Sequence, residues 1–417
     1  MARHTADPAR LSPTDASAAA VCGIVPPHLL QHLAQDADPQ VARMARRSLQ
    51  SRQRVGGLRR VRGSSGSGRS TPGATGFVPG NLTGAVTEAE APAATGTPTP
   101  ERRIHDAEHT TELPGTLVRA EGAEPTGDES VNEAYDGLGH TFDLLAAVYG
   151  RNSLDDEGLP LIATVHYDRD FANAFWDGAQ MVFGDGDGEI FSSFTDSLDV
   201  IAHELAHGLT QYTAGFTYVA QPGALNESVS DVFGSLVKQR LLGQSAEEAD
   251  WLIGEDIFVP GVNAKALRSM KAPGTAYDDP RLGTDPQPAT MDDYVVLPHD
   301  DENDNGGVHI NSGIPNHAFY LAATALGGNA WERAGQVWYD TITGRGIPQD
   351  ADFATFAGLT LTRAAERYGE DSAEHTAIAE AWRSVGVLDA AGETSGIDTS
   401  GTETSGAESS GSGLPPA

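Results

Sequence analysis

The chain has 417 residues, of which 39% are apolar and 21% charged, a composition that fits a globular protein of two or three domains. It contains no run of about 18 apolar residues, so no transmembrane helix is expected. The formal net charge of −32 argues against binding to nucleic acid or to anionic membranes. The single cysteine, Cys22, excludes an internal disulfide.

The N-terminal segment, residues 1–62, is basic, with ten arginines and four aspartates. Two explanations of the charge distribution stay open. Either the acidic body serves solubility, or the basic leader docks on it. Residues 24–50 are predicted to be helical, because their apolar residues are spaced for one stripe and Pro26-Pro27 suits a helix start.

The leader lacks the features of a secretory signal. The stretch 16–25 is mildly apolar, but Pro13, Asp15 and Gly23 interrupt or flank it, which indicates a prosegment instead. Secretion by a non-standard route and a cytoplasmic location are both compatible with this. Residues 63–100 are rich in Gly, Ser, Thr, Ala and Pro and are predicted to be a flexible linker, and residues 391–417 a disordered tail.

The body between linker and tail changes character along the chain. Strand-like runs at 161–167 and 180–183 predict a β-rich N-terminal lobe over residues 101–212. An α-helical lobe is predicted over 213–390. The fold class is therefore predicted to be α+β in two lobes. The predicted helices cover residues 200–213, 225–242, 311–327, 329–344, 351–368 and 373–386.

A candidate zinc site lies where the pattern turns helical. His203-Glu204-Leu205-Ala206-His207 is an H-E-x-x-H motif. Histidines at positions i and i+4 of a helix project from the same face and can bind one zinc ion. Glu204, next to the first ligand, can reach a water molecule on the metal. A chance occurrence of the pattern is the alternative, so the motif alone is suggestive.

A third ligand follows about twenty residues later. Glu227, in Asn226-Glu-Ser-Val-Ser-Asp231, can complete the zinc site from a second helix. Asp231 lies one turn further on the same face and can accept a hydrogen bond from the remaining N–H of a ligand histidine, which is expected to be His203. A solvated helix face is the alternative for this pair of acids.

With these residues the chain resembles thermolysin-like neutral metallopeptidases over about residues 102–388. Two further segments support the resemblance: Asn173 to Gly188, which is similar to the family's substrate-edge strand, and Asn305 to Ile314, which is similar to its second catalytic segment. The resemblance implies a two-lobed fold with zinc in the cleft between the lobes. Around Cys22 to Leu30 the leader resembles the short prosegment of protealysin-like members.

The resemblance also implies roles for individual residues. The expected zinc ligands are His203, His207 and Glu227, with Glu204 as general base and Asp231 behind a ligand. Oxyanion stabilisation is expected from His309, oriented by Asp304, and from Tyr218. The groups expected to hold the substrate backbone are Asn173, Ala174 and Arg268. The primary specificity pocket is expected to be lined by Phe191, Phe194, Val200, Ile253 and Leu267.

The apolar character of that pocket predicts an endopeptidase that cleaves on the N-terminal side of bulky apolar residues. Ordinary core packing is the alternative role for any one pocket residue. Two rival functions are a non-catalytic zinc-binding module and an esterase or other zinc hydrolase. The first is disfavoured because all ligands and the base are present. The second is disfavoured because the backbone-binding groups suit an extended peptide.

Calcium is a second ion to consider. Asp199, Asp250 and Glu255 match positions of the family's double calcium site, but Lys238 stands in place of one acidic ligand and Leu252 in place of another. We expect this calcium site to be lost, with the lysine ammonium replacing the cation.

The leader is expected to inhibit the precursor until it is removed. Insertion of residues 26–29 into the cleft, or capture of zinc by Cys22 or His28, are the routes considered. A buried thiol with no metal is the commoner role for such a cysteine. Cleavage is expected in the linker or near Arg102-Arg103. The sequence leaves open the natural substrate, the cleavage site, the export route and the oligomeric state.

Overall fold

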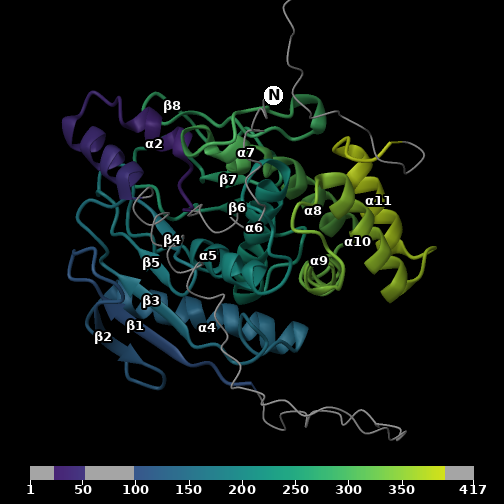
Figure 1. The fold of residues 1–417 in the computed structure, drawn as a ribbon, viewed down its shortest axis with the longest axis horizontal. Coiled ribbons are helices and arrows are strands. Elements are labelled where there is room, and N and C mark those ends of the chain that lie inside the picture. The colour runs from purple at the N-terminus through teal and green to yellow at the C-terminus, as the bar shows by residue number, and fades with distance from the viewer. Residues whose placement is uncertain (1–22, 52–97, 390–417) are drawn as a thin grey trace, which may run out of the picture.

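A computed structural model describes residues 23–51 and 98–389. The predicted tail, most of the predicted linker and Cys22 lie outside these ranges. Figure 1 shows the described chain as a sheet-containing lobe beside a helical lobe, with the leader on one side of the molecule. Among the described residues, no helix has both the length and the apolarity needed to cross a bilayer.

The N-terminal lobe is built on a five-stranded sheet in the order β2-β1-β3-β5-β4. Its three central strands, β1, β3 and β5, are parallel, and the two edge strands run antiparallel to them. Ile104, Ala163 and Met181 form one row across the central strands and are fully buried. The strands are β1 (Arg102–Asp106), β2 (Thr116–Ala120), β3 (Leu161–Val165), β4 (Ala174–Trp176) and β5 (Met181–Phe183).

The long helix α4 (Glu129–Tyr149) packs on this sheet and was not anticipated from the sequence. Its buried residues, among them Ala134, Leu138, Phe142 and Leu145, recur every three or four positions, which is a helical period. The two glycines within it lower its helix propensity. Gly137 has a packing role, because a Cβ at this position would lie 2.6 Å from Ile201. Helix α4 can therefore approach the next helix closely.

The C-terminal lobe is helical, and the two-lobed α+β prediction is confirmed. Its core is aromatic, with Trp338 stacked on Trp382 and Phe356 edge-on to both. Two small hairpins and two 3-10 turns lie between its helices: β6 (Leu252–Ile253) with β7 (Arg268–Ser269), β8 (Asp278–Asp279) with β9 (Gly283–Thr284), η1 (Met291–Asp293) and η2 (Asp301–Asn303). The N-terminal lobe, predicted over 101–212, ends with α5 (Leu198–Gln211). The helices of the C-terminal lobe are α6 (Ala220–Leu242), α7 (Asp304–Asn311), α8 (Gly313–Leu326), α9 (Ala334–Thr343), α10 (Phe353–Tyr368) and α11 (Ala373–Ser384).

Within residues 23–51 the leader forms two helices, so the prediction of one helix over 24–50 was wrong. Helix α2 (Pro27–Leu33) ends in a turn, and a second helix occupies residues 39–51. The break has a local cause. The Asp38 carboxylate accepts from the N–H of Gln40 at 2.8 Å, and Pro39 occupies the first helical position, which together make a helix start. The apolar stripe continues across the break, and Leu30, Val41 and Met44 are all buried.

Candidate metal centre and active site

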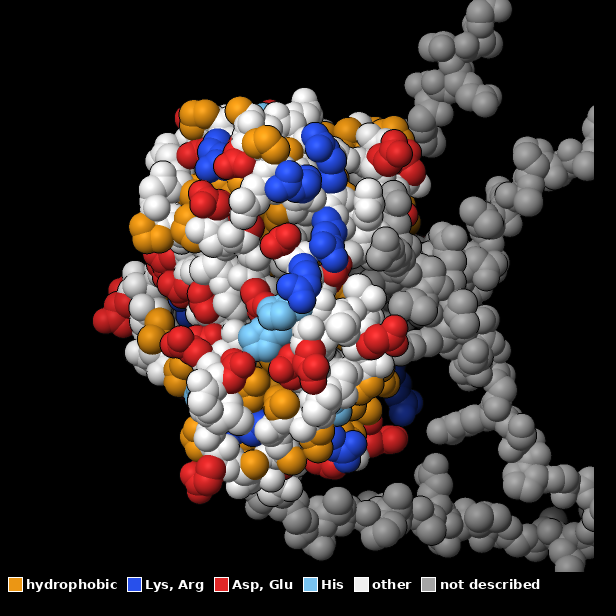
Figure 2. Space-filling view, turned by 90° about the vertical axis from the view of Figure 1, so that its left-hand side faces the viewer, with side chains coloured by type: hydrophobic (Ala, Val, Ile, Leu, Met, Phe, Trp, Pro, Cys, Tyr) orange, Lys and Arg blue, Asp and Glu red, His pale blue; other side chains and the backbone are white. Residues whose placement is uncertain are grey.

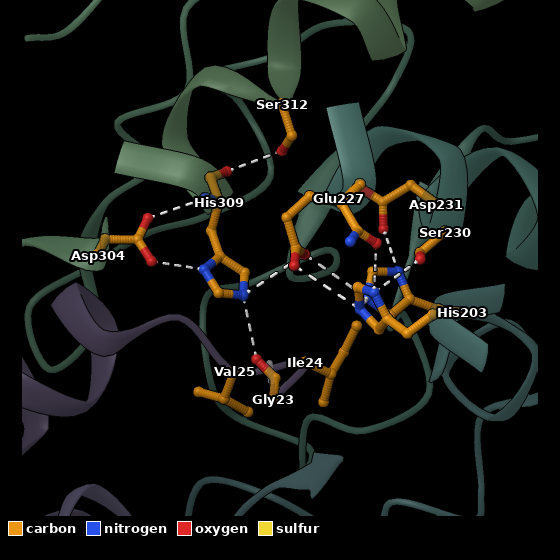
Figure 3. A network of polar contacts seen from close by, with 12 residues as sticks. Gly23, Ile24, Val25, His203, Glu227, Ser230, Asp231, Asp304, His309 and Ser312 are labelled. Atoms are coloured by element: carbon orange, nitrogen blue, oxygen red, sulfur yellow. Dashed lines mark hydrogen bonds and ion pairs between the residues drawn. The ribbon is translucent and has the colours of Figure 1, made fainter. Parts of the chain in front are cut away.

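Two packed helices bring the three predicted metal ligands together. His203 and His207 lie one turn apart on α5, and Glu227 lies on α6. The two histidine Nε2 atoms are 3.0 Å apart. The Glu227 carboxylate lies 3.6 Å from Nε2 of His203 and 3.7 Å from Nε2 of His207. All three side chains are buried, and Figure 3 shows Glu227 turned towards His203.

The close packing of α5 and α6 depends on Gly234. A Cβ at this position would lie 2.6 Å from the backbone oxygen of Asp199, so a side chain there would push the two helices apart. Glu227 lies two turns before Gly234 on α6. The glycine therefore helps to keep the carboxylate within reach of the histidines.

The outer nitrogens of both histidines are held by acceptors. His203 Nδ1 lies 2.8 Å from Asp231, as the sequence predicted, and His207 Nδ1 lies 2.9 Å from the Asn226 side-chain oxygen. Arg268 binds both oxygens of Asp231 at 2.8 Å. Burial alone would raise the pKa of Asp231, but Arg268 and the His203 hydrogen bond hold it well below its usual range. Asp231 is therefore an ionised acceptor that orients His203.

This arrangement fits zinc. Because Nδ1 of each histidine donates outward, each Nε2 presents a lone pair to the centre. Two such lone pairs and a carboxylate then converge within 4.8 Å of one another. Two imidazoles with one carboxylate are a typical ligand set for catalytic zinc.

Glu204 lies beside this centre and is fully buried. Its Oε2 atom accepts from the backbone N–H of Trp176 on β4 at 2.9 Å. Burial, and next the charge of Glu227, raise the pKa of Glu204 well above its usual range. A carboxylate with a raised pKa is suited to take up and release a proton near neutral pH.

His309 is oriented by Asp304, as predicted. Asp304 accepts from the backbone N–H of His309 at 2.8 Å and lies 2.6 Å from its Nδ1 atom. The pairing depends on the turn that opens α7, in which Asp304 to Gly307 all have positive φ. Gly306 and Gly307 adopt this conformation without a steric penalty. The ring then turns Nε2 towards the metal ligands, 3.4 Å from Glu227.

Tyr218 also reaches the centre. Its hydroxyl donates to the Glu227 carboxylate, and its ring packs edge-on to those of His207 and His309. The structure thus brings the predicted metal ligands, base and oxyanion groups into one buried cluster.

The backbone of the leader lies across this cluster. The Ile24 N–H donates to the Ala174 carbonyl at 3.1 Å, and Arg268 donates to the Ile24 carbonyl at 3.1 Å. The Asn173 side chain bonds both polar groups of the Val25 backbone. The three residues predicted to bind a substrate backbone therefore bind the leader.

The segment in contact with the site is residues 23–25. It precedes the 26–29 stretch considered from the sequence. His28 is not at the metal ligands, because its Nε2 atom pairs with the Tyr277 hydroxyl at 3.1 Å. The role proposed for Cys22 falls outside the described residues.

The five predicted pocket residues are all buried, each at most 1% exposed. Leu267 precedes Arg268, and its N–H bonds the carbonyl of Ile253 at 2.9 Å. Phe191 and Phe194 pack with ring centroids 5.7 Å apart. Leu267 and Ile253 therefore lie beside the arginine that holds Ile24.

In the ion pairs between leader and body, the leader supplies the cation in one case and the anion in the other. Arg47 of the leader pairs with Asp168 of the body, whereas Asp36 of the leader pairs with Arg281 of the body at 2.8 Å. The docked leader agrees with the docking hypothesis, but these two pairs do not favour a simple basic-on-acidic attachment.

Lys238 lies among the carboxylates of the predicted calcium position. Its Nζ atom is 3.3 Å from Asp199, 3.1 Å from Asp250 and 3.5 Å from Glu255. Burial alone would lower the pKa of the ammonium, but these carboxylates, Asp199 foremost, raise it above its usual range. The ammonium thus has the surroundings expected of a replacement for a cation.

Sequence reasoning missed several supporting groups. Asn316 donates to Asp231 at 2.8 Å from α8, and Ser230 lies 3.1 Å from His207 Nδ1. Asn226 and Ser230 flank Glu227 in the sequence, so their proximity to the ligand could have indicated them. No local pattern points to Asn316, which lies 85 residues from Asp231.

Comparison with known families agrees with this geometry. The family described as "Thermolysin metallopeptidase, catalytic domain" matches residues 94–211, and "Thermolysin metallopeptidase, alpha-helical domain" matches residues 214–387. This family consists of zinc-dependent peptidases, which are hydrolases.

Individual relatives point the same way. The chain is 57% identical over 286 residues to an extracellular metalloprotease of Pectobacterium carotovorum, covering 69% of this chain and 81% of that protein. It is 51% identical over 286 residues to protease PrtS of Photorhabdus, covering 69% and 76%. The solved precursor of protealysin from Serratia proteamaculans superposes with a TM-score of 0.74 at 48% identity, covering 88% of this chain and all of that one. The chain therefore belongs to the thermolysin family of metallopeptidases.

Proposed function

We propose that this chain is the latent precursor of a neutral zinc endopeptidase that cleaves on the N-terminal side of bulky apolar residues. One observation carries the proposal: a peptide backbone lies across the candidate metal ligands, held by Asn173, Ala174 and Arg268. A site of this kind suits an extended peptide better than a small ester. The Pectobacterium relative is described as extracellular, which favours the secreted alternative for this chain.

His203, His207 and Glu227 are the residues that would hold zinc. When bound, zinc supplies a Lewis acid that polarises the substrate carbonyl and makes water a better nucleophile. Glu204 takes a proton from the attacking water and passes it to the leaving nitrogen. Its buried setting, which raises its pKa, supports this exchange near neutral pH.

His309 and Tyr218 are proposed to stabilise the negative charge that develops on the carbonyl oxygen. Support comes from the Nε2 atom of His309, which lies 3.1 Å from the carbonyl oxygen of Gly23. Asp304 keeps the ring in this orientation through Nδ1. Because the site is buried, these donors act at low effective dielectric, where their effect on the transition state is large.

Specificity is proposed to come from the apolar residues beside Arg268. Latency is proposed to come from the leader, since an incoming peptide needs the same backbone partners that residues 23–25 occupy. The leader is thus an intramolecular inhibitor, and peptides or proteins are the substrates.

Casein digestion by processed enzyme tests the proposal, with and without a zinc chelator and alongside Glu204→Gln. We expect digestion by the wild type only, its loss with chelator, and its return when zinc is added. Profiling a peptide library should show apolar residues directly after the cleaved bonds.

Other outcomes separate the rival functions. Casein digestion by the Glu204→Gln protein would defeat the assigned mechanism. Zinc binding without hydrolysis of any peptide would indicate a binding module, and hydrolysis confined to small esters would indicate another hydrolase.

A further inference from the structure

We propose that the leader is bound as a substrate and that the peptide bond between Gly23 and Ile24 is cut by this chain's own site. The inference rests on the proposed function and adds a cleavage site inside the leader, distinct from the cleavage that separates leader from body.

The direction of the leader backbone supports this inference. In Ile24 and Val25, the backbone polar groups meet partners of the opposite kind among the substrate-binding candidates. The Ile24 N–H donates to the Ala174 carbonyl, the Ile24 carbonyl accepts from Arg268, and the Val25 N–H donates to the Asn173 oxygen. A chain in the reverse direction would exchange the positions of its donors and acceptors. Because Arg268 is assigned to the carbonyl beyond the cleaved bond, the contacts put the cleaved bond immediately before Ile24.

The reacting atoms of that bond lie at the reacting groups. The Gly23 carbonyl oxygen is 3.1 Å from Nε2 of His309, the atom proposed to stabilise the oxyanion. Figure 3 shows this oxygen directed at the His309 ring. On the other side of the bond, the Ile24 N–H donates to the Ala174 carbonyl at the start of β4 at 3.1 Å. The same strand holds Glu204, whose carboxylate accepts a hydrogen bond from the Trp176 N–H at 2.9 Å. One strand thus positions both the base and the nitrogen that would leave.

The side chains on both sides of the bond fit as well. Ile24 is bulky, apolar and fully buried, as the proposed specificity requires of the residue after the cleaved bond. Gly23 lies against Asn173, and a Cβ at this position would be 2.9 Å from the Asn173 amide nitrogen. A glycine therefore lets the backbone lie against the residue that holds Val25.

The reaction consumes one water molecule and no other reactant. Water oxygen adds to the Gly23 carbonyl carbon, Glu204 carries a water proton to the Ile24 nitrogen, and the carbon–nitrogen bond breaks. The products are a carboxylate at Gly23 and an ammonium group at Ile24.

Cleavage at this bond does not release the inhibitor. Residues from Ile24 onwards keep the Asn173 contacts, the buried face of α2 and the pairs of Asp36 with Arg281 and Arg47 with Asp168. The nicked leader then resembles a bound product. The precursor is expected to stay latent after this cut and to become active only when the remaining leader is lost.

The test uses the full-length, zinc-loaded precursor. N-terminal sequencing and mass spectrometry should find a fragment that ends at Gly23 and a new N-terminus at Ile24, formed at a rate independent of precursor concentration. The Glu204→Gln precursor should stay intact. Ile24→Asp should slow the cut at least about tenfold because it buries a charge, whereas Ile24→Leu and the surface control Arg43→Ala should leave the rate near that of the wild type.

A crystal structure of the zinc-loaded Glu204→Gln precursor gives a second measurement that does not depend on turnover. It should show the intact bond with the Gly23 oxygen directed at the metal site. A reversed or shifted leader would overturn the proposal, and so would an intact precursor or a cut that depends on concentration. Processed enzyme assayed on a free peptide separates the two failures: active enzyme with an uncut precursor refutes this inference alone, whereas inactive enzyme refutes the proposed function.

Discussion

The side-chain amide of Asn173 forms hydrogen bonds with both polar groups of the Val25 backbone. Its oxygen accepts from the Val25 N–H at 2.9 Å, and its nitrogen donates to the Val25 carbonyl at 3.3 Å. Asn173 is itself only 1% exposed, so water cannot readily replace either bond. The same amide can hold a substrate once the leader has gone, which couples inhibition and substrate binding through one residue.

Asn173→Ala should therefore weaken leader and substrate together. Losing two buried hydrogen bonds is expected to cost about 2 to 4 kcal/mol, or roughly 10²-fold in affinity. The measurements are the inhibition constant of a synthetic leader peptide and kcat/KM on a short peptide, both with processed enzyme. Asn173→Asp keeps the acceptor and loses the donor, so it should fall between wild type and Asn173→Ala. Unchanged inhibition by the leader peptide would contradict the assigned contact.

His309→Ala should lower turnover without releasing the metal. Removing one donor to a developing oxyanion is expected to cost about 10² to 10³ in kcat. KM and zinc content should change little, because the three metal ligands remain. Asp304→Asn should have a smaller effect in the same direction, since it misorients the ring without removing it. A variant with normal kcat but raised KM would show that His309 binds the ground state instead.

Because Lys238 lies at the predicted calcium position, the stability of the wild-type protein should not depend on calcium binding at that position. Lys238→Met leaves three carboxylates facing one another, one of them, Asp199, fully buried, so the free energy of unfolding should fall by about 2 kcal/mol or more. Lys238→Glu restores an acidic ligand and should make the melting temperature rise with added calcium. Calorimetry with calcium or with a calcium chelator gives the comparison. The prediction would be refuted if calcium raised the melting temperature of the wild type and replacement of Asp199 abolished that rise.

His166 predicts a loss of stability in alkaline solution. Its Nδ1 atom lies 2.8 Å from Asp185 and its Nε2 atom 2.9 Å from Asp128. The hydrogen bond with Asp185 contributes most and outweighs partial burial, so the pKa of His166 rises from 6.5 to about 9. Because the folded state holds the proton more tightly, this contribution is complete below pH 6.5 and is lost as the pH rises through about 9.

The expected size is about 1 kcal/mol, because both carboxylates are partly exposed and screened. Urea unfolding of His166→Gln in an inactive Glu204→Gln background should show a flatter dependence on pH over this interval. His140→Gln, on α4, serves as the matched control and should keep the wild-type slope. Parallel pH profiles for all three proteins would contradict the assignment.

Local sequence patterns account for the metal ligands, Glu204 and Asp231, whereas the oxyanion, backbone-binding and pocket residues were expected only from the family resemblance. Ligands at i and i+4 on α5, and Glu227 with Asp231 one turn apart on α6, follow from helical spacing alone. Patterns of this kind cannot reveal partners joined by the fold, such as Asn316 beside Asp231 or the Trp176 N–H on Glu204. They also could not identify which leader residues contact the site, because the hydrogen bonds that hold residues 23–25 are made by their backbone.

The same distinction applies to the fold, whose class could be predicted from local patterns although some of its elements could not. The shift from strand-like to helical patterning predicted the two lobes, since burial on a sheet and on a helix imposes different periods. Helix α4 was missed because Gly137 lowers local helix propensity, yet close packing against Ile201 requires that glycine. The break between the helices at residues 27–33 and 39–51 was missed because the apolar stripe crosses it, although the Asp38-Pro39 pair marks it.

Zinc stoichiometry of the purified Glu204→Gln precursor tests the central claim most directly. The account predicts one tightly bound zinc per chain, located by anomalous scattering between His203, His207 and Glu227, and its loss when any one of these is replaced by alanine. A folded precursor that binds no zinc, or that binds it equally well without these three side chains, would contradict it.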